Sequence, residues 1–180
     1  ALTAARQIQD EGYRAQVLSA LADKLIPELL SEALTAVRQI QDEGYRAEVL
    51  SALADKLTPE LLPEVLATAR QIEDEGDRAQ VLSALTDKNS ELLPETLAAI
   101  RQIEYESNRA YNLSALADKF PELLPEALAV AQQIEYESNR AYTLSVLAGK
   151  LTPELLPEAL TAALQIQDEG YRAQVLSALT

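Results

Sequence analysis

The chain has 180 residues, of which 48% are hydrophobic and 24% charged, and its formal net charge is −14 at pH 7. It contains no Cys and no His, which excludes disulfides, thiolate metal sites and imidazole-based catalysis or metal ligation. A surface this acidic disfavours nucleic acid and anionic membranes, and it either favours a basic partner or serves solubility alone.

No run in the sequence approaches the roughly 20 apolar residues that span a bilayer. No charged, apolar and small-residue leader opens the chain, so we expect a cytoplasmic protein that does not contact membranes. Because the chain starts at Ala1 rather than Met, a removed leader and an excised fragment both stay open.

A phrase that begins Arg-Gln-Ile-Gln-Asp-Glu-Gly-Tyr-Arg recurs with small changes along the whole chain. Its isoleucine marks the register and returns about every 31–32 residues, within the range of known repeat families. The isoleucines are Ile8, Ile40, Ile72, Ile103, Ile134 and Ile166. A fixed period of this size is typical of stacked-repeat arrays and Ala/Leu-rich repeats favour helix, so we expect an all-α solenoid of antiparallel helix pairs.

We expect a single solenoid domain over 1–180 with about five and a half repeats and twelve helices. The predicted repeat units are 1–26, 27–58, 59–89, 90–120, 121–152 and 153–180. Neither end carries a distinct polar capping repeat, which indicates a fragment of a longer array.

Residues 27–42 illustrate the first helix of a repeat. Leu30, Leu34, Val37 and Ile40 follow one another at intervals of four, three and three, which is one face of an α-helix. The loops are short, so neighbouring helices are expected to run antiparallel.

Gly44 is predicted to end this first helix in the left-handed conformation. Residues 45–56 are then predicted to form the second helix, with Leu50 on its buried face. In repeats four and five a serine replaces the glycine, and the following Asn108 and Asn139 are predicted to adopt the closing conformation.

Prolines stand about one turn inside the first helix of four repeats, where each would cost a backbone hydrogen bond. They are Pro63, Pro94, Pro125 and Pro157. We therefore expect either a separate opening turn, such as 59–62, or a bent start to the helix. Thr58 and Pro59 are predicted as the N-cap and first residue of that helix.

Two arginine rows recur with the repeat. The first lies just after the turn, each arginine following a glutamate of the same turn: Arg14, Arg46, Arg78, Arg109, Arg140 and Arg172. These arginines could grip carboxylates or phosphates, but an acidic neighbour in every copy favours an ion-pair ladder between adjacent repeats.

The second row lies on the first helices, away from the apolar face, and stops after four repeats. It consists of Arg6, Arg38, Arg70 and Arg101. We predict that this row forms a partner-binding surface on the concave side of the solenoid; the alternative is a solvated helix face.

Repeats four and five carry tyrosines where the other repeats carry polar residues: Tyr105, Tyr111, Tyr136 and Tyr142. Tyrosine is favoured at binding surfaces, so these residues are predicted to form a partner-binding aromatic patch. The alternative is that Tyr111 and Tyr142 fill space lost where Asn112 and Thr143 replace valine.

The acidic turns do not indicate a catalytic or metal-binding site. Their carboxylates repeat identically, without the alternating ligands of a calcium loop or a pair in contrasting environments. The sequence also lacks a glycine-rich phosphate loop. We expect a protein that is not an enzyme and that uses no metal or cofactor.

The second helix and the next opening turn carry an Ala-Ala-Pro spacing, as at Ala47, Ala54 and Pro59. With these residues the chain resembles the tetratricopeptide class of α-solenoids, although its period is shorter than the roughly 34 residues of that class and the large first-helix aromatics are absent. It is similar to the arrays attached to large bacterial signalling ATPases. The resemblance implies a right-handed superhelix and a non-catalytic scaffold that binds a peptide or protein, which the charge predicts to be basic, on its concave face. The alternative is a structural spacer or an array that associates end to end with copies of itself.

Overall fold

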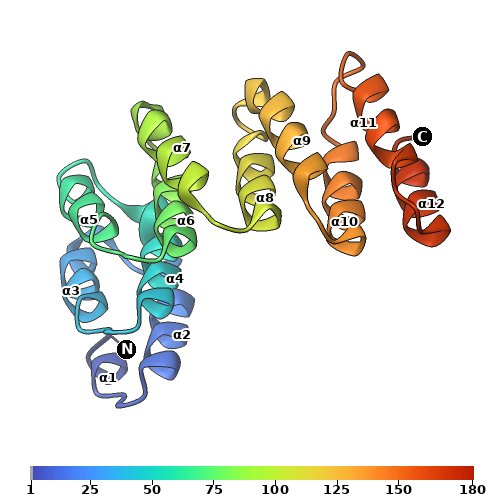
Figure 1. The fold of residues 1–180 in the computed structure, drawn as a ribbon. Helices are drawn as coiled ribbons and strands as arrows, with labels where there is room; N and C mark the ends of the chain where they lie inside the picture. The colour runs from blue at the N-terminus through green and yellow to red at the C-terminus, as the bar shows by residue number, and fades with distance from the viewer. Residues whose placement is uncertain (1) are drawn as a thin grey trace. The chain divides into compact units, whose positions relative to one another are not determined.

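A computed structural model describes residues 2–180, and within them the fold is all-α, as expected (Figure 1). These residues form twelve α-helices and three short 3-10 helices, without a β-strand. The α-helices are α1 (Leu2–Arg6), α2 (Glu11–Ala22), α3 (Pro27–Val37), α4 (Glu43–Leu53), α5 (Leu62–Ala69), α6 (Glu75–Thr86), α7 (Leu93–Gln102), α8 (Glu106–Leu116), α9 (Leu124–Gln133), α10 (Glu137–Ala148), α11 (Leu156–Leu164) and α12 (Glu169–Ala178). The 3-10 helices are η1 (Ala54–Lys56), η2 (Ser90–Leu92) and η3 (Pro121–Leu123).

The chain divides into two compact units, one up to Ala99 (unit 1) and one over Ile100–Thr180 (unit 2). Within each unit, the second helices of successive repeats pack side by side, more closely than the first helices do. The expectation of one domain over 1–180 and that of a right-handed superhelix both stay predictions.

The predicted boundary between the two helices of a repeat was wrong. The first helix, α3, ends at Val37 rather than at Asp42, and Gly44 lies in the first turn of the second helix, α4. The physical reason is that Asp42 caps α4, because its carboxylate accepts a hydrogen bond from the Tyr45 N–H at 2.9 Å. Among the described residues, no glycine has a positive φ.

The same correction applies to repeats four and five. Asn108 and Asn139 do not close a helix in the left-handed conformation, because they lie in the first turns of α8 and α10. No non-glycine residue between 2 and 180 has a positive φ. The phrase Glu-Ser-Asn-Arg therefore begins a helix in these repeats rather than ending one.

The presence of a proline one turn into a repeat changes where the first helix of that repeat starts. In the second repeat, where Ser31 holds the proline position, α3 begins at Pro27. In the third repeat Pro63 moves the start to Leu62, and a separate turn precedes it in which the Thr58 carbonyl accepts the N–H groups of residues 61 and 62. The separate opening turn is thus confirmed, and the prediction that Pro59 begins the helix was wrong.

The core consists of the predicted helix faces. Leu30, Val37 and Ile40 of the second repeat are fully buried, as are Ala47 and Leu50. These residues fill the space between the first and second helices and between neighbouring second helices. No helix within residues 2–180 combines the length and apolar character needed to cross a membrane.

Candidate functional site

The arginines that follow the turn have a structural role. Arg46 donates from Nη1 to the Ile40 carbonyl at 2.9 Å and from Nη2 to Glu43 at 3.2 Å. It therefore connects the segment between α3 and α4 to the first turn of α4. Arg140 does the same with Ile134 and Glu137. Ion pairs of this kind are described for Arg14, Arg46, Arg109, Arg140 and Arg172, and each lies within one repeat rather than between adjacent repeats as predicted.

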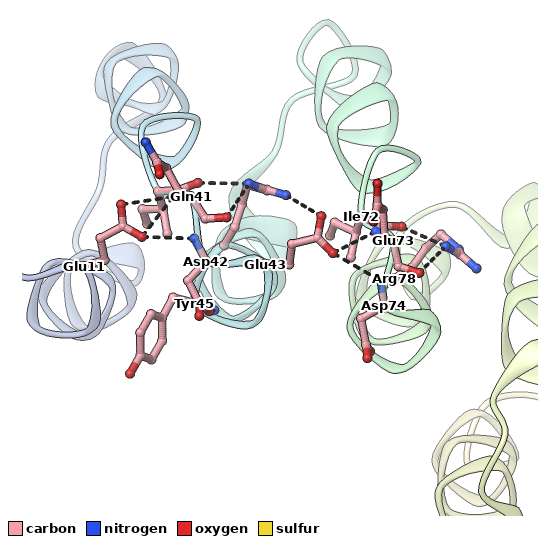
Figure 2. Close-up of polar contacts among 11 residues, drawn as sticks. Glu11, Gln41, Asp42, Glu43, Tyr45, Ile72, Glu73, Asp74 and Arg78 are labelled. Atoms are coloured by element: carbon pink, nitrogen blue, oxygen red, sulfur yellow. Dashed lines mark hydrogen bonds and ion pairs between the residues drawn. The ribbon is translucent and has the colours of Figure 1, made fainter.

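The contact between adjacent repeats is made by the glutamate of this pair (Figure 2). Glu43 accepts the backbone N–H groups of Glu73 and Asp74, in the next repeat, at 2.8 and 3.1 Å. Glu11 in unit 1 and Glu137 in unit 2 accept the equivalent pairs of N–H groups. These hydrogen bonds lower the pKa values of Glu11 and Glu137.

Acid should therefore weaken both units. The pKa values of Glu95 and Glu126 are also lowered, chiefly by hydrogen bonds from arginine. A carboxylate whose folded-state pKa is depressed stabilises the fold above its unfolded-state pKa, and this contribution is lost as the pH falls through the folded-state pKa. Burial raises the pKa of Asp77, so that residue acts in the opposite direction. We expect the urea concentration at the unfolding midpoint to decrease as the pH is lowered from about 6 to about 3.

The control for this expectation is Glu11→Gln combined with Glu137→Gln. This variant should lose part of the pH dependence, because two of the carboxylates with a depressed pKa are gone. A midpoint that stays constant over the same pH range in the original chain would contradict the role of these groups.

The arginine row on the first helices is paired within the protein. Arg70 forms a bidentate ion pair with Glu95, with Nε–Oε1 and Nη2–Oε2 distances of 2.7 and 2.8 Å. Arg101 pairs with Glu126 in the same bidentate geometry. Arg6 and Arg38 form ion pairs with Glu32 and Glu64. Each arginine thus reaches the first helix of the next repeat.

A ligand at this row would have to compete with carboxylates that already occupy the guanidinium groups. Sequence reasoning missed the partner glutamates, although each follows its arginine at nearly the same spacing along the chain. The row lies on the helices that pack less closely within each unit. Its placement on a concave binding face stays a prediction.

The four tyrosines of repeats four and five lie on the surface of unit 2. Tyr111 and Tyr142 are 62% and 61% exposed, and Tyr105 and Tyr136 are 66% and 71% exposed. The alternative interpretation, in which Tyr111 and Tyr142 fill the space left by lost valines, was wrong. Thr143 itself occupies the buried position that Val49 and Val81 occupy in other repeats.

A groove lies between α8 and α10, with a volume of about 200 Å³. We call it the tyrosine groove. It is lined mainly by apolar surface, from residues that include Tyr111, Ser114, Tyr142, Thr143 and Val146. Ser114 is buried, and its hydroxyl has no hydrogen-bond partner within the part of the chain that the structure describes, a property it shares with the equivalent serines of the first three repeats.

A second, more polar hollow adjoins this groove, and we call it the acidic hollow. Glu104, Tyr105, Glu135 and Tyr136 line it, and Ser107 and Asn139 belong to both depressions. The predicted tyrosines are therefore brought together on one surface of unit 2. Sequence reasoning did not identify the two glutamates, whose signal was their position directly before each tyrosine.

Tyr105 and Tyr136 occupy a position that stabilises the helix in the other four repeats. There an aspartate accepts a backbone N–H at 2.9 Å and caps the second helix. Neither Tyr105 nor Tyr136 makes a side-chain capping bond. Two repeats thus carry exposed tyrosines in place of caps, a local departure of the kind expected at functional sites.

We expect Tyr105→Asp and Tyr136→Asp each to raise the free energy of unfolding by about 0.5–2 kcal/mol, because each restores a cap. Urea denaturation followed by circular dichroism measures the change. Asp42→Ala is the matched control and should lower the free energy by a similar amount. If the aspartate variants are less stable than the original chain, the tyrosines stabilise the fold and this argument fails.

Comparisons with protein-family models, with curated proteins and with solved structures gave no match to this chain. The all-helical repeat fold is therefore established from the chain itself, and the likeness to tetratricopeptide arrays stays a prediction. Within residues 2–180, no group of three or more acidic side chains is arranged to hold a metal ion.

Proposed function

We propose that this chain is a non-catalytic interaction scaffold that binds a peptide or protein segment at the tyrosine groove. The observation that carries the proposal is the four exposed tyrosines of repeats four and five, two of which replace helix caps. Tyrosine offers a large, rigid contact area together with a hydroxyl group, which is why it is enriched in protein interfaces.

The arrangement of the groove fits a polypeptide better than a small molecule. The same groups occur twice, in α8 and again in α10, so a ligand with its own regular repeat can contact both sets. An extended peptide has such a repeat. Many of the carboxylates that could serve catalysis, such as Glu43 and Glu137, are held by backbone N–H groups.

The test replaces Tyr111 and Tyr142 with Gln, the residue that stands at the same position in the first, third and sixth repeats. A displayed random peptide library first supplies ligands selected on the original chain. We expect their affinity for the double variant to fall at least about tenfold, because each tyrosine buries interface area. Fluorescence anisotropy with labelled peptides measures the affinity.

Two controls accompany this test. Tyr13→Gln combined with Tyr45→Gln removes exposed tyrosines from unit 1 and should leave the affinity unchanged. Arg38→Gln combined with Arg70→Gln tests the arginine row, using the residue found at the equivalent Gln132, and should also leave it unchanged. Ligands that bind the Tyr111→Gln, Tyr142→Gln variant as tightly as the original chain would overturn the proposal.

A second candidate function is an array that associates with further copies of itself. The observation that favours it is Glu169, which is 92% exposed, whereas the equivalent Glu11, Glu43 and Glu137 reach an adjoining repeat. Leu164 on α11 is also exposed. Light scattering over a range of concentrations, with Leu164→Arg as the matched variant, decides this candidate. A molar mass that does not change with concentration would exclude it.

A further inference from the structure

We propose that the ligand of this surface is an extended peptide segment with two basic side chains three residues apart and an apolar side chain between them. This inference rests on the proposed function and specifies the chemistry of the partner. The basic side chains would enter the acidic hollow, and the apolar one would enter the tyrosine groove.

The acidic hollow has unsatisfied negative charge. Glu106 and Glu137 also lie near the turns, but Arg109 and Arg140 pair with them. Glu104 and Glu135 are exposed, and no ion pair engages their carboxylates among the described residues. Both line the hollow, and each directly precedes a tyrosine.

A carboxylate beside an aromatic ring is a combination that recognises a cationic side chain. A guanidinium group can form two hydrogen bonds with a carboxylate and stack on a neighbouring ring. An ammonium group can form an ion pair with the carboxylate and a cation–π contact with the ring. The net charge of −14 attracts such a ligand over longer distances. Charge complementarity therefore selects a basic segment.

The spacing follows from the repeat. The Glu-Tyr pair occurs at residues 104–105 and again at 135–136, one repeat later. Packed helices lie about 8–10 Å apart. An extended peptide in the polyproline II conformation advances about 3.1 Å per residue and has three residues per turn, so side chains three residues apart lie on the same side of it. Three residues of an extended peptide therefore match one repeat, which places two basic side chains at the two Glu-Tyr pairs.

The tyrosine groove supplies the apolar part of the site. Tyr111, Tyr142 and Val146 present apolar surface between the two repeats, next to the acidic hollow. Asn108 and Asn139 are exposed at its edge, and their amides can each donate to and accept from a peptide backbone. An apolar side chain between the two basic ones fits this order of groups.

The experiment uses the peptides selected from the displayed library, together with a labelled probe of sequence Gly-Arg-Ala-Leu-Arg-Gly. Glu104→Gln combined with Glu135→Gln introduces the residue that the first, second and sixth repeats carry at this position, so the fold tolerates it. We expect the affinity for the probe to fall about tenfold, because two charge-assisted contacts are lost. Glu73→Gln, which removes one equivalent charge from unit 1, should leave the affinity unchanged.

The outcomes separate this inference from the proposed function. It is supported if the tyrosine-dependent ligands carry two basic residues at this spacing and lose affinity in the glutamine double variant. Tyrosine-dependent ligands that lack such a pair, carry it at another spacing or bind the glutamine variant equally well would overturn this inference alone. A library that yields no tyrosine-dependent ligand would overturn the proposed function as well.

Discussion

Replacing Leu50 with alanine should lower the free energy of unfolding by about 2–5 kcal/mol. Leu50 is 1% exposed and lies on α4, which packs against α2 and α6 within unit 1 (Figure 1). The substitution removes apolar surface from the core and leaves a cavity that the surrounding helices fill only in part. Urea denaturation monitored by far-UV circular dichroism measures the change.

Leu164→Ala is the matched control, since it makes the same chemical change at a side chain that is 66% exposed. Its effect should stay within about 0.5 kcal/mol, because little apolar surface is lost from the core. A cost for Leu50→Ala as small as that of the control would mean that α4 does not present this face to its neighbours.

Replacing Glu43 with alanine should cost roughly 1–3 kcal/mol, because it removes hydrogen bonds to a charged acceptor. The Glu43 side chain is 30% exposed, and its carboxylate accepts hydrogen bonds from two backbone N–H groups of the next repeat and from the Arg46 guanidinium. The substitution leaves both N–H groups to water and frees a half-buried arginine. The same denaturation experiment reports the loss.

Glu169→Ala is the control for this prediction. Glu169 stands at the same position of its repeat, but its side chain is 92% exposed and its pairing with Arg172, at 3.9 Å, is the longest of the equivalent pairs described. We expect Glu169→Ala to change the stability by no more than about 0.5 kcal/mol. Equal losses in the two variants would show that the contact between repeats contributes nothing and that glutamate matters only inside its own turn.

The helix boundaries show where sequence reasoning succeeded and where it did not. The apolar spacing of Leu30, Val37 and Ile40 predicted a buried face, and all three are buried. The sequence pattern predicts that a helix ends at Gly44, whereas Asp42 just before it caps the next helix. A glycine after a helical pattern and a glycine in a first helical turn look alike in a single sequence. The capping bond between Asp42 and Tyr45 distinguishes them.

The candidate site could also be predicted only in part from the sequence. The tyrosines were recognisable from the sequence, because they break a repeat that is otherwise regular. Their exposure was not, because Thr143 could have left space for Tyr142 to fill and only the packing of α8 against α10 decided the matter. The partners of the arginine row were missed for a related reason. Arg70 and Glu95 are distant in sequence and meet only when two repeats stack.

The sequence alone determined that this protein is a helical repeat, because the period, the apolar faces and the Ala/Leu-rich composition are local properties repeated many times. It also determined which repeats differ. The tertiary structure decided which charges are used within the protein and which face outward. That outcome depends on contacts between neighbouring repeats, where Glu43 reaches the next turn and Arg70 reaches the next first helix. The four tyrosines of repeats four and five lie outside this network of contacts, and on their surface we place the function.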